Sequence, residues 1–406
     1  MIKTALTFLV IYFSLQIASD LNKDNLRDLK PSPKKIPVTF DAHGVKRVDN
    51  YYWMRDDTRK DQEVIDHLNT ENAYLEGWFA SGLDERDKLF QEITDRIPKK
   101  EDSVPIRLKN YEYFRRYEPE NEYAIYIRRK NKNSEEIVLL DVNELAHGKD
   151  FYQLANWSIS PSESLMAYAE DINGRRQYSI KFKDLIKSET YDYVIENTSG
   201  DMAWSAEGDY LFYVLRDEET LLPHKVFRHK VGTSQDTDEL VYEEKDTTFY
   251  LSVGNTRSME FIELSISSTT SSETRLIKSN NPTSSPEIFY KREKDHLYSV
   301  DHDPASDRFL IESNWNATNF RLLEVNLIDS KVKENWKEII PHREAVLLQA
   351  VIPFPKHLVV MERENGLKKL RILDKESLNS RTVNFNDPTY TAYLASNPEY
   401  DVDRFY

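Results

Sequence analysis

The stretch Asn156-Trp157-Ser158-Ile159-Ser160 is a short run of strand-forming residues, and runs of the same kind recur at a fixed interval. Ser158, Ser205, Ser252 and Ser299 stand 47 residues apart, in the runs 156–160, 203–205, 250–253 and 298–300, and similar runs return near Gln349 and Ser396. A period of roughly forty to fifty residues filled with short strands is typical of a β-propeller, in which each repeat forms one four-stranded blade. The spacing therefore predicts a mainly β fold.

The repeat that begins at Ser205 shows how a blade is expected to form. Three further short strands are predicted over residues 210–214, 225–229 and 240–242, with polar turns between them. Apolar and polar residues alternate over 262–266 and 323–327, as in a ribbon with one buried face. Helical periodicity is absent from Ser103 onward.

The number of repeats predicts a propeller that is not complete. One blade begins near Val104, and six inner-strand runs follow it, which gives seven starts. The run near Ser396 has few residues after it, and an open blade leaves unpaired backbone groups. We therefore predict a seven-bladed β-propeller over residues 103–406, truncated in blade seven, and expect the chain to be the front part of a longer protein.

The first 19 residues have the pattern of a secretory signal peptide. Lys3 precedes a mostly apolar stretch over 5–18, and the small residues Ala18 and Ser19 come before Asp20. The stretch is shorter than the ~20 residues that span a bilayer, so a permanent anchor is the weaker alternative. We predict a secreted or periplasmic protein with no membrane association after signal removal. The glycosylation sequons at Asn156, Asn197 and Asn316 are treated as chance matches.

Residues 20–102 are predicted to form a helical amino-terminal segment before the propeller. From Asp61, one helix carries Val64, Leu68, Leu75 and Phe79 near one face, and a second helix, with Asp84 as its N-cap, carries Leu89, Phe90, Ile93 and Ile97 and stops at Pro98. Two amphipathic helices need a cover for their apolar faces. The sequence leaves open whether the propeller rim or a separate domain covers these faces.

The composition restricts the classes of partner. The chain has 70 acidic and 55 basic residues and a net charge of −15, which argues against nucleic acid or an anionic membrane as partner. The acidic surface favours basic peptides, or simply keeps the protein soluble. There is no cysteine, which excludes disulfides, thiolate catalysis and thiolate metal sites.

Several stretches resemble one enzyme family. The segment Val48-Asp49-Asn50-Tyr51-Tyr52-Trp53-Met54-Arg55-Asp56-Asp57, followed by Glu71-Asn72-Ala73-Tyr74, resembles the amino-terminal signature of the prolyl oligopeptidase family, and most closely its oligopeptidase B branch. Residues 169–171 with 175–178, residues 220–229 and residues 241–246 also resemble that branch. The resemblance runs collinearly from about Pro37 to the end of the chain.

The resemblance implies a serine peptidase of two domains. In this family a seven-bladed propeller caps an α/β-hydrolase domain, and the amino-terminal helical segment packs mainly against that catalytic domain. The propeller admits only short peptides. The oligopeptidase B branch cleaves after Arg or Lys, using acidic residues of the catalytic domain, and needs no metal or organic cofactor.

The chain departs from the family pattern because the catalytic motif is absent. The family's nucleophile lies in a G-x-S-x-G turn, and no two glycines of this chain are four residues apart. In the family the serine, aspartate and histidine all lie downstream of the propeller. We therefore assign no catalytic, cofactor-binding or metal residue and expect the chain to be inactive alone. A free-standing propeller that binds proteins or peptides as a scaffold is the alternative.

Other conspicuous residues receive structural interpretations. Asp301-His302-Asp303 resembles a metal-ligand cluster, but a solvated turn is the preferred interpretation, because no second ligand group accompanies it. Trp157 and Trp204 occupy matching points of successive repeats and are predicted to lie in the core between blades. The pairs Arg175-Arg176 and Glu243-Glu244 either form inter-domain contacts, line the peptide passage, or are ordinary surface charges.

Overall fold

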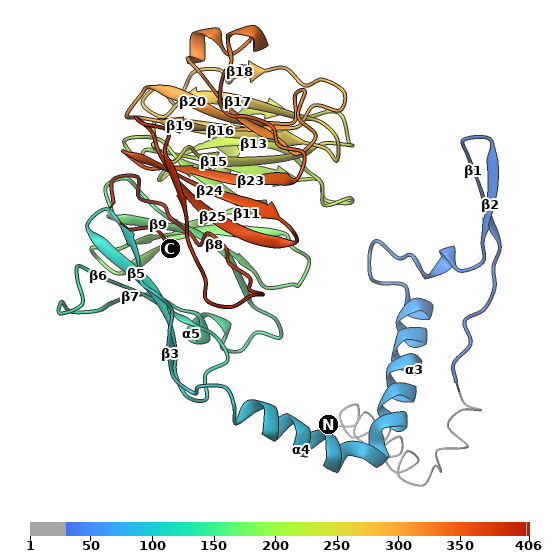
Figure 1. The fold of residues 1–406 in the computed structure, drawn as a ribbon. Coiled ribbons are helices and arrows are strands. Elements are labelled where there is room, and N and C mark those ends of the chain that lie inside the picture. Colours follow the sequence, from blue (N-terminus) through green and yellow to red (C-terminus); the bar gives the residue numbers. More distant parts are fainter. Residues whose placement is uncertain (1–29, 403) are drawn as a thin grey trace. The chain divides into compact units, whose positions relative to one another are not determined.

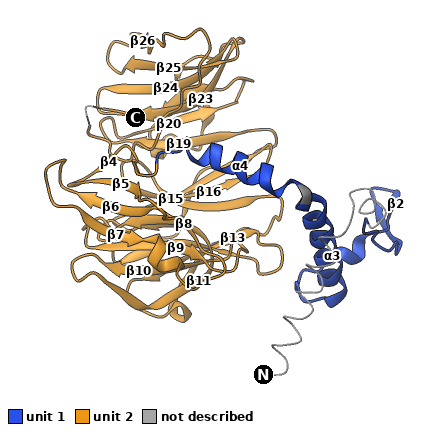
Figure 2. Ribbon diagram, turned by 90° about the horizontal axis from the view of Figure 1, so that it is seen from below, with its two compact units in different colours: residues 1–98 blue, residues 99–406 orange. Residues whose placement is uncertain are grey.

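The computed structural model describes residues 30–402 and 404–406, so the predicted signal peptide over residues 1–19 lies outside the described residues. The chain divides into two compact units, residues 1–98 and 99–406 (Figure 2). Within the part of the chain that the structure describes, no helix has the length and the apolar character needed to cross a membrane.

The first unit contains a β-hairpin and two helices. The hairpin pairs β1 (Val38–Ala42) with β2 (Val45–Asp49), and η1 (Tyr52–Met54), α3 (Gln62–Phe79), η2 (Ala80–Gly82) and α4 (Leu83–Thr94) follow. As predicted, Asp61 caps the first helix, and its side chain accepts a hydrogen bond from the Glu63 backbone N–H at 2.9 Å.

The second helix differs from the prediction at both ends. Its N-cap is Gly82 rather than Asp84, because the short helix η2 leads directly into α4. Asp84 lies instead in the first turn, where its charge still favours the positive end of the helix dipole. The helix ends at Thr94, before Pro98.

The apolar residues of these two helices are largely exposed. Val64, on the predicted apolar face of α3, is buried. The other apolar residues of α3 and α4 that the periodicity singled out, and Ile97 beyond α4, are at least half exposed: Leu68, Leu75, Phe79, Leu89, Phe90, Ile93 and Ile97.

The second unit is a series of antiparallel sheets, each built from strands that follow one another in the chain (Figure 1). Blade one contains β3 (Glu101–Asp102), β4 (Ile106–Leu108), β5 (Tyr111–Tyr117), β6 (Ile125–Arg129) and β7 (Ile137–Asp141). A seven-stranded sheet contains β8 (Gln153–Ile159), β9 (Leu165–Asp171), β10 (Tyr178–Asp184), β11 (Glu189–Trp204), β12 (Tyr210–Arg216), β13 (Pro223–Lys230) and β14 (Glu239–Glu243).

Three four-stranded sheets follow. Blade four contains β15 (Tyr250–Asn255), β16 (Phe261–Ser267), β17 (Ser272–Lys278) and β18 (Glu287–Tyr290), and blade five contains β19 (Tyr298–Asp303), β20 (Arg308–Ser313), β21 (Arg321–Val325) and β22 (Lys337–Ile340). Blade six contains β23 (Val346–Pro353), β24 (His357–Glu364), β25 (Leu367–Asp374) and β26 (Ser380–Thr382). Short helices α5 (Val142–Ala146), η3 (Gln235–Thr237), η4 (Leu327–Asp329) and η5 (Lys333–Asn335) lie in connections, so helix is not wholly absent after Ser103.

The long strand β11 serves two blades. Its first part pairs with β10 in blade two, and its last part pairs with β12 in blade three, with a register shift between Thr198 and Met202. Gly200 sits in this shift at φ +87°, where a Cβ would come within 3.2 Å of the Tyr178 ring. The positive φ and the close approach together require glycine at this point.

The fold confirms the predicted propeller but differs from the prediction at its last blade. Strands occupy the runs at Ser158, Ser252, Ser299 and Gln349, and β11 ends beside Ser205. The predicted inner strand near Ser396 is wrong, since the described residues after Thr382 contain no strand. The backbone N–H of Ala395 donates to the Tyr406 carbonyl at 2.9 Å, but one such bond does not make a ladder. Leu327 likewise lies in η4 instead of extending β21.

The core lies between successive blades. Five clusters of buried apolar side chains join blade one to two, two to three, three to four, four to five and five to six. Trp204 is fully buried in the cluster between blades two and three, and Trp157 packs on Tyr113 and Tyr126 of blade one, with ring centroids 5.7 and 6.0 Å apart. Both tryptophans therefore lie between blades, as predicted.

Candidate functional site

Residues of blades one to four and of the C-terminal segment line a cavity of about 610 Å³. Its lining comes from blade one, from β8 of blade two, from Met202 of blade three, from Asn255 and Met259 of blade four, and from Ser396 and Pro398 of the C-terminal segment. Since residues from four blades and the C-terminal segment meet there, the cavity lies where the inner strands converge.

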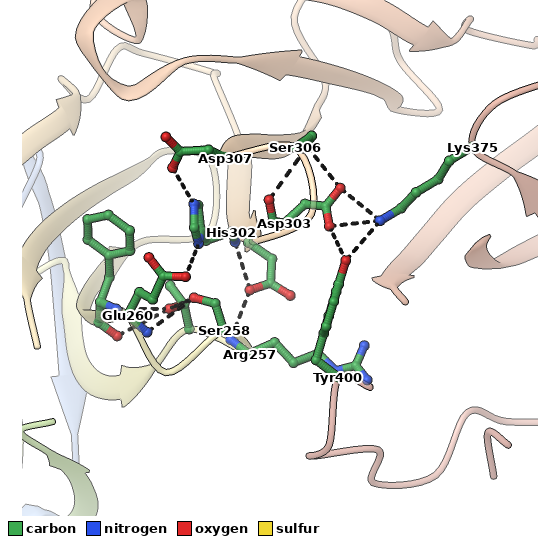
Figure 3. A network of polar contacts seen from close by, with 12 residues as sticks. Arg257, Ser258, Glu260, His302, Asp303, Ser306, Asp307, Lys375 and Tyr400 are labelled. Atoms are coloured by element: carbon green, nitrogen blue, oxygen red, sulfur yellow. Dashed lines mark hydrogen bonds and ion pairs between the residues drawn. The ribbon is translucent and has the colours of Figure 1, made fainter. Parts of the chain in front are cut away.

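A polar network joins the turn after β15, the end of β19, the turn after β25 and the C-terminal segment (Figure 3). Arg257, in the turn after β15, donates through Nε to the Asn397 carbonyl at 2.9 Å and through Nη2 to the Glu399 carbonyl at 2.5 Å. Its third guanidinium nitrogen, Nη1, donates to the Pro353 carbonyl, and the guanidinium lies over the Phe354 ring at 4.3 Å.

A second group in the network centres on Asp303, at the end of β19. The Lys375 ammonium lies 2.7 and 2.8 Å from the two carboxylate oxygens of Asp303, and the Tyr400 hydroxyl donates to Oδ1 at 2.6 Å. Burial opposes ionisation of Asp303, but these hydrogen bonds outweigh it and hold the pKa of the carboxyl below its ordinary value. Burial and the neighbouring carboxylate both raise the pKa of Tyr400.

The structure corrects the interpretation of Asp301-His302-Asp303 as a solvated turn. These residues are the last three of strand β19, and His302 and Asp303 are buried. The ring of His302 packs against Phe261 and Phe309, with centroids 5.0 and 4.9 Å away. The blade-five turn begins only at Pro304, so the polar side chains before it face the neighbouring blades. No group of three metal-ligating side chains occurs among the described residues.

Three carboxylates lie near one another along blades four and five. Burial raises the pKa of Glu263 to about 7, and the charge of Asp301 adds to this effect. Burial also raises the pKa of Glu312 to about 7, again with a contribution from Asp301, although the carboxylate accepts a hydrogen bond from the Val351 N–H at 2.7 Å. Burial raises the pKa of Asp301 itself. Ionisation of these buried carboxyl groups near neutral pH is therefore unfavourable.

The charged pairs singled out in the sequence have different surroundings. Glu244 is buried, receives hydrogen bonds from Tyr242 at 2.8 Å and from Arg292, and so belongs to a contact within the propeller. Glu243 lies 3.5 Å from Lys225. Arg176 is exposed at φ +58°, and its backbone N–H donates to Asp171. For Arg175, Arg176 and Glu243 the sequence alternatives therefore stay open.

Sequence reasoning did not identify Arg257, Lys375 or Tyr400. No motif joins them, because Arg257 of blade four and Lys375 of blade six are 118 residues apart, and Tyr400 of the C-terminal segment lies 25 residues further on. The only signal in the sequence is that Arg257 and Asp303 come at or just after the end of an inner strand.

The comparisons with known proteins agree with this architecture. The family described as "Prolyl oligopeptidase, N-terminal beta-propeller domain" matches residues 30–406. The chain belongs to the prolyl oligopeptidase family. It corresponds to the amino-terminal propeller part of the family's peptidases.

Relatives and solved structures place the chain within longer proteins. It is 37% identical over 390 residues to a dipeptidyl aminopeptidase BI of Pseudoxanthomonas mexicana, covering 91% of this chain and 53% of that relative. It is 32% identical to a protease 2 of Moraxella lacunata, covering 92% and 54%. The structure of oligopeptidase B from Leishmania major matches with a TM-score of 0.87 and 28% identity, over 92% of this chain and 56% of that one. The chain thus spans about half the length of these proteins.

Proposed function

We propose that this chain is the propeller part of an oligopeptidase B-like serine endopeptidase that hydrolyses short peptides after Arg or Lys. The propeller limits access to the active site, and the chain is inactive alone because it lacks the Ser-Asp-His triad. Its partner is an α/β-hydrolase domain, and no cofactor is involved. The observation that carries the proposal is the family match over residues 30–406, which leaves about half of each relative uncovered.

The exposed apolar face of the amino-terminal helices supports a catalytic partner. Phe90 is 66% exposed, and Leu89, Ile93 and Ile97 are each more than half exposed. Four exposed apolar side chains within residues 89–97 indicate a site of protein contact. A hydrolase domain would cover it.

The charge of the chain supports a preference for basic peptides. A net charge of −15 creates a field that attracts cationic substrates and raises their association rate at low salt. We also propose, from the first 19 residues alone, that the protein is secreted or periplasmic; a cytoplasmic location is the alternative.

The test is a comparison of two products of the native gene. One is the 406-residue chain, and the other includes all coding sequence to the stop codon. We expect the longer product to cleave an amino-terminally blocked chromogenic peptide after Arg and after Lys, and to leave the matching Ala peptide intact. The 406-residue chain should cleave none of them. Hydrolysis after Ala or Pro but not after Arg would contradict the specificity, and a stop codon directly after Tyr406 would favour a free-standing scaffold.

A second candidate activity follows from the 37% identity to a dipeptidyl aminopeptidase BI. Such an enzyme would release dipeptides from a free amino terminus. A dipeptide chromogenic substrate with a free amine, assayed beside its blocked form, separates the two. An endopeptidase accepts the blocked form, whereas a dipeptidyl aminopeptidase requires the free amine.

A further inference from the structure

We propose that blade five is a movable blade of the propeller, and that ionisation of Glu263, Asp301 and Glu312 above neutral pH loosens its junctions with blades four and six. Loosening both junctions widens the passage along the propeller axis. The loosening is a property of this chain alone, whereas its effect on substrate access rests on the proposed function. All three carboxyl groups belong to blades that have four strands.

The repeat shows that two of these carboxyl groups replace apolar side chains. The second strands of blades two to five begin at equivalent residues: Leu165, Tyr210, Phe261 and Arg308. In blades two and three the third and fifth residues of this strand are buried apolar side chains that face the following blade: Ala167, Ala169, Phe212 and Val214. In blade four the third residue is Glu263, and in blade five the fifth residue is Glu312. A polar group at such a position lowers stability, and breaks of this kind are expected where function requires them.

Glu263 lies beside an open space and has weak hydrogen bonding. Its partner on the inner strand is Gly254, and a Cβ at Gly254 would meet no atom within 4 Å. The Ser265 hydroxyl donates to the Glu263 carboxylate at 3.4 Å, which is long for a hydrogen bond. Burial raises the pKa of Glu263 to about 7, with a contribution from the charge of Asp301. This side chain therefore changes its charge near neutral pH.

Asp301 and Glu312 cross the two junctions of blade five. Asp301 accepts a hydrogen bond from the Arg257 backbone N–H of blade four at 3.1 Å, and Glu312 accepts one from the Val351 N–H of blade six at 2.7 Å. Burial raises the pKa of both groups, and the charge of Asp301 adds to the effect on Glu312. Because Asp301 opposes ionisation of both glutamates, the three groups respond to pH together.

The cations near these groups do not neutralise them. Arg257 and His302 lower the pKa of Asp301, but burial has the larger effect. The Arg257 guanidinium donates to backbone carbonyls and not to a carboxylate. Further charged groups beside the inner strand of blade five pair with one another, His302 with Glu260 and Asp307, and Lys375 with Asp303. Above neutral pH the three carboxyl groups gain negative charge without gaining a cation.

Blade five stays attached to blade four at its outer edge. The connection 326–336 lies along β18, the edge strand of blade four, where the Ser330 hydroxyl donates to the Phe289 carbonyl at 2.8 Å. The buried Trp336 ring packs on Tyr290, with centroids 5.1 Å apart. A blade that is held at its outer edge and repelled near its inner strands opens toward the propeller axis.

Hydrogen exchange of the 406-residue chain tests the movement independently of any peptidase activity. We expect the protection factors of β19 and β20 to fall by about tenfold or more between pH 6 and pH 8.5, while those of β9 and β12 change less. Glu263→Gln with Glu312→Gln keeps the size of both side chains and should abolish this difference. Glu207→Gln with Glu287→Gln, at two exposed positions, is the matched control and should behave as the parent chain. An equal fall in all blades, or an unchanged difference in the Glu263 and Glu312 variant, would overturn the proposal.

Thiol labelling gives a second readout that does not require the double glutamine variant to fold. The chain has no cysteine, so Ile311→Cys and Ile195→Cys each create a single thiol at a fully buried position. Ile311 lies between blades four and five, and Ile195 between blades two and three. Because alkylation also follows the thiolate fraction, the ratio of the two rates is the readout. The ratio of Ile311→Cys to Ile195→Cys should rise several-fold from pH 6 to pH 8.5, and a constant ratio would overturn the movement.

The effect on access is tested in the complete gene product. The kcat/KM of a peptide of about thirty residues, divided by that of a blocked dipeptide, should rise several-fold from pH 6 to pH 8.5 in the parent and stay constant in the Glu263→Gln, Glu312→Gln variant. The catalytic groups titrate equally for both substrates and cancel in the ratio. A constant ratio in the parent would overturn the effect on access while leaving the peptidase assignment intact. If the parent cleaves neither substrate, the proposed function fails, and exchange and thiol labelling alone decide the movement.

Discussion

The junctions between neighbouring blades and the contacts of the C-terminal segment with the blades are of opposite kinds. Blades one to six are joined by apolar clusters such as the one that buries Trp204, whereas among the described residues no apolar cluster joins blade six to blade one. The C-terminal segment instead contacts blades four, five and six through Arg257, Asp303 and Lys375, and blade one through the Lys109 backbone N–H. Apolar burial stabilises strongly and without direction, but ion pairs and hydrogen bonds recover little more than their desolvation cost. Apolar burial therefore joins neighbouring blades, whereas polar contacts hold the C-terminal segment against them.

The largest effect should come from an apolar junction. Trp204→Ala removes a fully buried ring from the core between blades two and three, and we expect a loss of about 3–5 kcal/mol in the free energy of unfolding. Chemical denaturation measures it. Ile328→Ala, at a side chain that is 89% exposed, is the control and should change little. An unchanged melting temperature for Trp204→Ala would contradict the apolar junction.

A smaller effect is expected from the ion pair between Lys375 and Asp303. Lys375→Met leaves the Asp303 carboxylate buried without its cation, at a cost of about 1–3 kcal/mol, because Lys375 is itself partly exposed. Because the pKa of Asp303 is lowered in the folded protein, its stabilising contribution is present above the ordinary pKa and is lost as the pH falls through the lowered value.

The matching double variant, Lys375→Met with Asp303→Leu, removes both charges. It shows how much of the loss comes from leaving the Asp303 carboxylate buried and unpaired. It should recover most of the loss, since it leaves no buried charge. If the double variant is as unstable as the sum of both single variants, the pair is not coupled as the structure shows.

A pH-dependent effect is expected from the carboxylates of blades four and five. With a pKa of about 7 in place of 4.5, Glu263 takes up a proton on folding, so stability falls as the pH rises from 4.5 to 7. Glu263→Gln should therefore raise the free energy of unfolding by about 1–2 kcal/mol at pH 8 and by almost nothing at pH 4.5.

The control for that effect is Glu207→Gln, at an exposed side chain in the turn between β11 and β12. It should change the free energy of unfolding little at either pH. An equal gain for Glu263→Gln at both pH values would show that the carboxylate is not held protonated.

The smallest effect on stability is expected at the exposed apolar residues of α4. Phe90→Ser in the 406-residue chain should change stability by less than about 0.5 kcal/mol, because the ring is already exposed. In the complete gene product the same substitution should destabilise the protein or weaken activity, because the proposed hydrolase domain covers this face. Equal, negligible effects in both would remove the face from the proposed domain contact.

The sequence predicts those parts of the fold that repeat. A 47-residue period and alternating apolar residues identify blades because each inner strand must bury the same face against its neighbour. Trp204 was predicted for that reason. The N-cap of α4 was missed because η2 already turns the chain before Asp84.

The polar network was not predictable from the sequence because its members do not repeat. Asp301-His302-Asp303 has the composition of a turn, but Asp303 pairs with Arg308 of β20, so the strand continues to Asp303. The partner of Asp303 is 72 residues away, and no pattern joins the two. The run near Ser396 was predicted as a strand because its sequence resembles the other inner strands.

The central claim is that this chain supplies the propeller of a serine peptidase and that the nucleophile lies outside it. Labelling with a serine-directed phosphonate tests it most directly, with the 406-residue chain and the complete gene product treated side by side. We predict stoichiometric labelling of the complete product, at a residue beyond Tyr406, and no labelling of the 406-residue chain. Stoichiometric labelling of a serine within residues 1–406 would contradict the account.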